Sequence, residues 1–253
     1  MDSVADMVDA ASRAGVHTMA LTEHYPLTER WDLGGFISMP AERVDEYCDA
    51  VLAAREAHPE MNVLLGTEVD WLGDNEDRVF HPGEFDRFDL VLGSVHYVDG
   101  WAFDDPDHKE HWDDVGVDQI WRRYFEIWCQ AAQSDQPFTI MSHPDLVKKF
   151  GYRPDYDVQP LYDDAADAAR SAGRMVEVNT SGAYYDCEEM FPAPDLLKTF
   201  FRAGIPCSIG TDAHRCAHVA RGIDAGYRAL YDAGYRVVTV PTMGGGRREV
   251  PIE

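Results

Sequence analysis

The chain has 253 residues, of which 46 are acidic and 22 are basic, so its formal net charge is −24 and its pI is near 4.6. This length suits one α/β barrel, and we therefore predict a single domain over residues 1–253. The strong negative charge disfavours nucleic acid and anionic membranes as partners. The five cysteines are scattered without a CxxC pair, and no segment is typical of a signal peptide or a bilayer-spanning helix, so we expect a cytoplasmic protein.

Helices and strands alternate along the chain. The first helix is predicted over residues 2–14 and ends at Gly15, and a strand over 16–24 follows. The next predicted elements are a helix over 41–57, strands over 62–70 and 89–97, a helix over 117–133, a strand over 138–144, a helix over 160–172, a strand over 174–182, a helix over 194–203, a strand over 206–214 and a helix over 217–233. Six strands that alternate with helices predict a parallel sheet in a closed or nearly closed barrel, and the tail 235–253 predicts a hairpin around its glycines.

Imidazole and carboxylate groups stand where the predicted strands end. These residues are His24, Glu68, His96, His143, Asp212 and His214. Catalytic groups of β/α barrels converge from the C-terminal ends of different strands, so we expect all six to face one cavity. One such residue alone is more often a hydrogen-bond partner that orders a loop. Six in equivalent places favour a site for Zn, Fe or Mn.

Basic and polar residues near the same strand ends are candidates for binding a substrate. Arg215 directly follows the last acid and histidine pair, and Lys148 also stands out in so acidic a chain. Arg binds phosphate with two parallel hydrogen bonds and Lys binds it as a point charge. For Lys149 the alternative of a solvated helix face is equally good. Asn179 could orient a substrate or a water molecule, or it could cap a loop.

The ordered segments "TEH", "GTEVD", "GSVHYVDGWAFDDPD", "SHPDLVKKFG", "VEVNTSGAYYDCEEMFPAP" and "GTDAHRCAHVARG" resemble the PHP (polymerase and histidinol phosphatase) superfamily. The resemblance covers nearly the whole chain and is specific to the histidinol-phosphatase branch. It implies a distorted (β/α)7 barrel with a cluster of up to three divalent transition metal ions. It also implies hydrolysis of a small phosphomonoester, L-histidinol phosphate, to L-histidinol and phosphate in histidine biosynthesis.

The resemblance implies how the strand-end residues share the ions. Glu68, His96 and His143 would form the ligand set of one ion. Asp212 would hold a second ion, which Glu68 bridges to the first.

The remaining residues would serve a third ion and the reaction itself. His24 and His214 would hold the third ion. We expect catalytic roles for His96, Asp212 and His214.

PHP chains begin with a strand that carries His-x-His, whereas this chain contains no HxH and opens on a helix. We therefore expect that the first strand and three ligands are missing from this chain, that a strand bearing His-x-His precedes Met1, and that fewer than three ions bind. Two alternative functions stay open. One is a PHP-type nuclease or other phosphoesterase, which would need a basic groove, and the other is a catalytically impaired PHP protein with a binding role.

Overall fold

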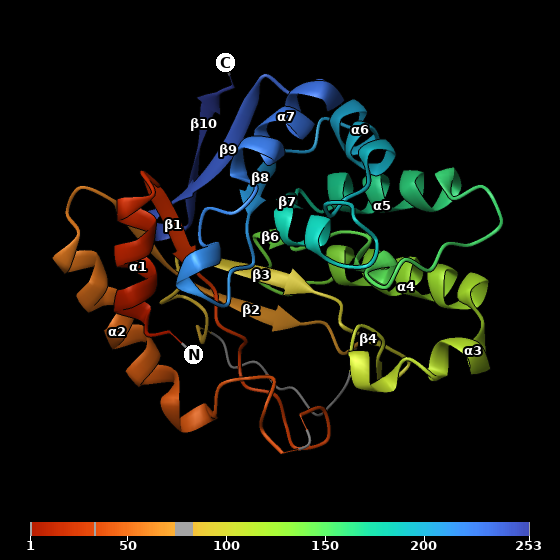
Figure 1. Cartoon of the computed structure of the whole chain (residues 1–253), viewed down its shortest axis with the longest axis horizontal. Coiled ribbons are helices and arrows are strands. Elements are labelled where there is room, and N and C mark those ends of the chain that lie inside the picture. Colours follow the sequence, from red (N-terminus) through yellow and green to blue (C-terminus); the bar gives the residue numbers. More distant parts are fainter. Residues whose placement is uncertain (1, 33, 74–82, 253) are drawn as a thin grey trace.

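A six-stranded parallel sheet forms the centre of the computed structural model, which describes residues 2–32, 34–73 and 83–252. The strand order is β1-β2-β3-β6-β7-β8. The strands span Thr18–Leu21 (β1), Asn62–Asp70 (β2), Leu90–Ser94 (β3), Ile140–Met141 (β6), Met175–Asn179 (β7) and Cys207–Gly210 (β8). The sheet is curled into part of a barrel, with the helices on its outer side (Figure 1). This arrangement confirms the predicted strands and the barrel-type α/β fold.

The described residues form seven α-helices, which are α1 (Val4–Arg13), α2 (Val44–Ala57), α3 (His111–Val115), α4 (Val117–Gln133), α5 (Gln159–Ser171), α6 (Pro194–Arg202) and α7 (Ile223–Ala233). A capping box between Ser3 and Asp6 fixes the start of α1. α7 begins later than predicted, because Gly222 has a φ of 82° and Cys216–His218 forms a separate 3₁₀ turn. No helix in the described part of the chain combines the length and the apolar character that crossing a membrane requires.

Two antiparallel hairpins accompany the parallel sheet. β9 (Val237–Thr242) pairs with β10 (Gly246–Pro251), which confirms the predicted C-terminal hairpin. β4 (Tyr97–Val98) pairs with β5 (Trp101–Ala102) across Asp99 and Gly100, both of which have positive φ. Asp-Gly with two positive φ angles is a favoured two-residue turn. This small hairpin starts the long segment that leads away from β3.

The inner face of the sheet changes character along the strands. Near the strand starts it carries a small apolar cluster of Leu64, Leu90, Leu92, Ile140 and Met175. Side chains two residues apart on a strand share one face. The same face therefore continues on β2 as Glu68 and Asp70, and on β7 as Glu177 and Asn179. The polar half of this face lies at the C-terminal ends of the strands, on an apolar floor.

Candidate metal centre

Strand β2 supplies two carboxylates to the polar half of the inner face. Glu68 pairs in register with Leu92 and Asp70 pairs with Ser94. Both side chains are buried, with 9% of Glu68 and 1% of Asp70 exposed. A buried carboxylate is costly unless a cation or hydrogen-bond donors compensate it. Compensating groups therefore must lie close to both residues.

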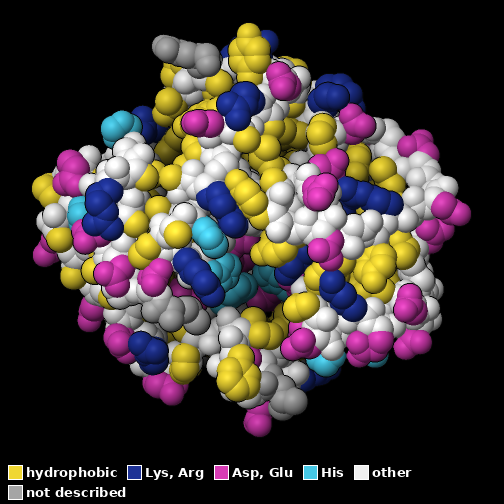
Figure 2. Space-filling view, viewed as in Figure 1, with side chains coloured by type: hydrophobic (Ala, Val, Ile, Leu, Met, Phe, Trp, Pro, Cys, Tyr) yellow, Lys and Arg dark blue, Asp and Glu magenta, His cyan; other side chains and the backbone are white. Residues whose placement is uncertain are grey.

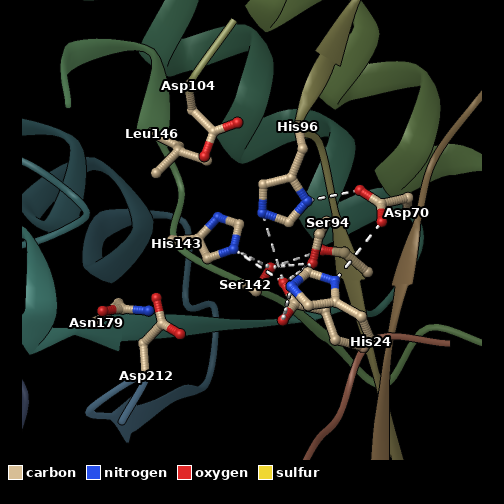
Figure 3. Close-up of polar contacts among 12 residues, drawn as sticks. His24, Asp70, Ser94, His96, Asp104, Ser142, His143, Leu146, Asn179 and Asp212 are labelled. Atoms are coloured by element: carbon tan, nitrogen blue, oxygen red, sulfur yellow. Dashed lines mark hydrogen bonds and ion pairs between the residues drawn. The ribbon is translucent and has the colours of Figure 1, made fainter. Parts of the chain in front are cut away.

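Three histidines from neighbouring strand ends surround these carboxylates (Figure 3). His24 continues beyond β1 and forms a parallel bridge with Glu68. His96 follows β3, and its Nδ1 lies 2.6 Å from Asp70 Oδ1. His143 follows β6, and its Nε2 lies 3.0 Å from Glu68 Oε1. We call these five residues the strand cluster: His24, Glu68, Asp70, His96 and His143.

The strand cluster contains two sets of ligand atoms that lie within 4.8 Å of one another. One set is His24, Asp70 and His96, and the other is Glu68, His96 and His143. The second set is the one that the family resemblance implies for a single ion. His143 Nδ1 is buried without a hydrogen-bond partner among the described residues. Imidazole nitrogen and carboxylate oxygen are donors that zinc, iron and manganese accept.

The charges of the strand cluster depend on one another. Burial favours the neutral forms of Glu68 and Asp70, but the neighbouring histidines outweigh it and hold the pKa of both carboxyls well below the usual range. Burial likewise opposes the charged form of His24, yet Glu68 and Asp70 raise its pKa to about 10. For His96, burial is outweighed mainly by Asp70, and its pKa rises to about 9. Protons on the histidines thus balance the carboxylates, and a bound cation can replace those protons.

Two buried serines lie next to Glu68 and His143. Ser94 Oγ donates to Glu68 Oε1, and Ser142 Oγ lies 2.6 Å from Ser94 Oγ. Ser142 Oγ is also 3.2 Å from His143 Nε2. These hydroxyls fix the orientation of groups that would contact a metal, as partners of metal ligands commonly do.

The segment after β8 carries the other predicted residues, and we call Asp212, His214 and Arg215 the Asp212 segment. Asp212 has a φ of 49° and lies beside Asn179, across from His143 (Figure 3). It is close enough to contribute to the raised pKa of His24. The side chain of His214 is 66% exposed, and its Nδ1 lies 3.0 Å from the Asp212 backbone carbonyl. The structure therefore gathers His24, Glu68, His96 and His143 with Asp212 nearby, and it leaves His214 outside this group.

The residues predicted to bind phosphate are placed differently from one another. Arg215 is exposed. Lys148 does not fit the predicted role, because its side chain has no exposed surface and its ammonium donates to Asp145 Oδ2 at 3.0 Å and to the Met190 carbonyl at 2.8 Å. Asn179 is also buried, and its Nδ2 donates to Glu177 Oε2 at 3.1 Å.

The basic residue beside the site is Lys149. Its Nζ lies 2.9 Å from Asp104 Oδ2 and 3.0 Å from the Asp104 carbonyl oxygen. Asp104 points toward His96 and His143 (Figure 3). Burial opposes the charge of Asp104, but His96 and Lys149 outweigh it and lower the pKa of this carboxyl. Lys149 thus belongs to the surroundings of the strand cluster and not to a solvated helix face.

Sequence reasoning did not identify three carboxylates of this region as neighbours of the histidines. Asp70 stands two residues after Glu68 on the same strand, and this period of two could have identified it as a partner of the histidines. Glu177 is a charged residue within the apolar run of β7, which is a second usable signal. Asp104 lies in the irregular segment after β5, and no pattern in the sequence brings it to His96.

The centre of this face of the molecule is hollowed, and histidine and acidic side chains show at the bottom of the hollow (Figure 2). Lysine and arginine side chains stand around its rim in a chain that is otherwise strongly acidic. A rim of this kind favours the entry of a small anion into the hollow.

Comparisons with known proteins relate the sequence and the fold of the chain to other proteins. Residues 1–181 match the PHP domain family. The chain is 32% identical over 246 residues to a probable histidinol-phosphatase of Deinococcus radiodurans, and the match covers 92% of this chain and 88% of that one. A probable histidinol-phosphatase of Schizosaccharomyces pombe is 23% identical over 229 residues, with 83% and 74% covered. The crystal structure of a histidinol phosphate phosphatase from Lactococcus lactis subsp. lactis, in complex with zinc, L-histidinol and phosphate, has the same fold, with a TM-score of 0.75, 19% identity and 98% and 94% of the two chains covered.

Proposed function

The chain belongs to the PHP domain family, and from this premise we propose that it is a metal-dependent histidinol-phosphatase. It hydrolyses L-histidinol phosphate to L-histidinol and phosphate. The observation that carries this proposal is the convergence of Glu68, His96 and His143 on one point, in a chain 32% identical to a probable histidinol-phosphatase. We place the reaction in histidine biosynthesis and in the cytoplasm, in keeping with the names of the relatives and with five free cysteines.

We propose that one domain carries this activity over residues 1–253. The match to the PHP domain family ends at residue 181, within the sheet. β8 lies beyond that point, yet it pairs with β7 through the registers Val176–Cys207 and Asn179–Gly210. A boundary near residue 181 would cut this pairing, so the family core and the C-terminal part form one sheet.

The donors present fit a zinc ion, because imidazole and carboxylate atoms lie in two close sets and His143 Nδ1 is buried without a hydrogen-bond partner among the described residues. Glu68, His96 and His143 would hold one ion, and His24, Asp70 and His96 offer donors for another. Asp212 would add a further carboxylate to this centre, since it lies across from His143. Metal ions in such sites supply a nucleophilic water at neutral pH and charge to stabilise the leaving alkoxide.

The residues of the chain bind and orient the phosphate ester around this centre. Lys149 is the basic residue that we propose contacts a phosphoryl oxygen, in place of the fully buried Lys148. The ammonium group of Lys149 has three N–H donors. It donates one to the carboxylate and one to the backbone carbonyl of Asp104, and these two hydrogen bonds fix the direction of the third N–H. Arg215 is a second, exposed cation for the same anion. In the hydrolysis, a water oxygen forms a bond to phosphorus and the bond between phosphorus and the ester oxygen breaks. A proton from the water ends on the alcohol oxygen of L-histidinol.

The test is phosphate release by the zinc-loaded protein from three substrates in parallel: L-histidinol phosphate, p-nitrophenyl phosphate and single-stranded DNA. We expect the highest kcat/KM for L-histidinol phosphate. Lys149→Met should raise KM for this substrate about tenfold, since one charged hydrogen bond contributes about 1.5–3 kcal/mol. The matched control is Lys109→Met, which removes an exposed lysine that pairs with Asp186. Faster cleavage of DNA would favour the nuclease, and no cleavage of any substrate would favour the binding protein.

A further inference from the structure

The backbone of His143 adopts a conformation that requires support. Its φ is 23°, outside the regions that residues other than glycine prefer, and Pro144 restricts it further. Such a conformation is unfavourable in itself and persists only where the surroundings enforce it. The direction of the imidazole, and so the geometry of the Glu68, His96 and His143 set, depends on what holds this backbone.

Glu177 provides that support from the neighbouring strand. Glu177 is 7% exposed, and its Oε2 accepts the backbone N–H of His143 at 2.9 Å. β6 and β7 are adjacent, with Met141 paired to Val176, so Glu177 meets His143 directly across the sheet.

The same carboxylate connects His143 to the Asp212 segment through a series of polar contacts. Asn179 Nδ2 donates to Glu177 Oε2 at 3.1 Å, and Asn179 Oδ1 accepts the Ser181 hydroxyl at 2.7 Å. The Ser181 hydroxyl in turn lies 3.4 Å from Asp212 Oδ2. One continuous chain of polar contacts therefore joins the two parts of the site.

The other oxygen of Glu177 lies directly over Gly210 of β8. A Cβ at Gly210 would lie 1.8 Å from Glu177 Oε1, and the three atoms nearest to it all belong to Glu177. Any larger residue at this position would displace the carboxylate. Because Oε2 is taken by two donors and Oε1 packs on Gly210, neither oxygen is directed to the ligand sets.

We propose that Glu177 is a positioning residue that holds His143 and Asp212 in one geometry, and that Gly210 is glycine because it must admit this carboxylate. The inference rests on the proposed metal-dependent activity. It adds a residue that orients His143 and Asp212 together for metal binding. Removal of one such supporting partner typically weakens metal affinity by about 10–100-fold.

The experiment titrates zinc into the metal-free full chain by calorimetry for Glu177→Ala, Glu177→Gln, Gly210→Ala and the double variant Glu177→Ala/Gly210→Ala. We expect zinc affinity to fall about 10–100-fold in Glu177→Ala, and less in Glu177→Gln, which keeps an oxygen acceptor for the His143 N–H. Gly210→Ala should cause a similar loss, because it displaces the carboxylate. The double variant should be no weaker than Glu177→Ala, since its Cβ then has space.

Asp89→Asn is the matched control. Asp89 is a buried carboxylate that accepts the Leu65 N–H at 2.9 Å, but it precedes β3 at the opposite end of the sheet. This variant should lower the melting temperature without changing zinc affinity. Circular dichroism establishes that each variant is folded. If Glu177→Ala is unfolded, the zinc affinity of Glu177→Gln, which keeps the side-chain volume, tests the inference.

Two results would overturn the inference alone. One is wild-type zinc affinity in every Glu177 variant that folds. The other is a loss of affinity in the double variant that equals the product of the losses in Glu177→Ala and Gly210→Ala. A wild-type chain that takes up no zinc would overturn the proposed function, and this inference with it.

Discussion

The strand cluster and the Asp212 segment differ in how the chain holds their side chains. Each member of the strand cluster lies on a strand of one parallel sheet or directly beyond its end, and short contacts such as His96 Nδ1 to Asp70 Oδ1 at 2.6 Å connect them. In the Asp212 segment, which follows β8 as a loop, the side chain of Asp212 is 30% exposed and that of His214 is 66% exposed. The first region is preorganised by strand register, whereas the second depends on a loop conformation.

Because of this difference, we expect the two regions to have different roles in metal binding and in turnover. A site that is fixed before its ligand arrives does not spend binding free energy on ordering side chains. The strand cluster should therefore decide whether the first metal ion binds. The Asp212 segment should matter more for turnover, because its groups contribute after that ion is in place. The predictions below test this division.

The largest effect should come from His96→Ala, because His96 belongs to both ligand sets. We expect zinc affinity and kcat/KM to fall by at least about a hundredfold, more than the loss of a supporting partner causes. Elemental analysis of protein purified without chelator, together with phosphate release, measures both. His108→Ala, which removes a histidine that is 58% exposed, is the control. Unchanged metal content in His96→Ala would refute the assignment of the strand cluster.

Lower pH should weaken zinc binding at the strand cluster. The pKa values of His24 and His96 are raised to about 10 and about 9, so both carry protons at neutral pH that zinc must displace. Affinity should fall about tenfold per pH unit for each displaced proton between pH 9 and pH 7. Calorimetry in buffers of different ionisation enthalpy counts these protons. His96→Ala should release one proton fewer, and an affinity independent of pH would contradict the prediction.

The same pKa shifts stabilise the folded, metal-free chain at low pH, whereas low pH weakens zinc binding. The folded-state pKa values of His24 and His96 lie above the ordinary value of 6.5, so their contribution is fully present below that pH. It is lost as the pH rises through about 9 and then about 10. Urea unfolding of the metal-free protein at pH 6.5 and at pH 10 measures this loss of stability. In the zinc-bound protein the same loss should be absent.

Asp212→Asn should lower kcat about tenfold and leave the affinity for the first zinc ion within about twofold. The reason is that Asp212 lies outside both sets of close ligand atoms. Steady-state kinetics and zinc titration of the same preparation separate the two effects. A loss of first-ion affinity as large as that of His96→Ala would show that the two regions act as one.

The smallest effect should come from His214→Ala. Because its side chain is 66% exposed and its Nδ1 faces a backbone carbonyl, we expect less than about a threefold change in kcat/KM. A loss equal to that of Asp212→Asn would instead show that His214 turns into the site when the substrate binds.

Regular segments were predictable because their patterns are long and local. β2 and α4 have the predicted bounds. The 17-residue helix carries a clear hydrophobic period, and the nine-residue strand begins with an apolar run of Val63, Leu64 and Leu65. β6 is shorter than predicted, with two residues instead of seven, because the chain leaves the extended conformation at His143, whose φ is 23°. The sequence shows that Pro144 follows, but not where the strand pairing ends.

The candidate site was predictable to the extent that strand ends define it. His24, Glu68, His96 and His143 lie together because parallel strands end at one edge of the sheet. The choice between Lys148 and Lys149 was not predictable. A 3₁₀ turn over Leu146–Lys148 directs Lys148 inward to Asp145, while Lys149 reaches Asp104. Both contacts depend on the conformation of the folded chain, which the sequence pattern does not show.

The alternation along β2 has a consequence for changes in chain length. One residue inserted between Leu64 and Glu68 would turn both carboxylates to the outer face and bring the neighbours Thr67 and Val69 to the histidines. The composition of the chain would barely change, yet the whole ligand set would be lost. An insertion of two residues would preserve the parity of the strand. Transplanting this centre into another sheet therefore demands the correct phase of the strand as strictly as the correct residues.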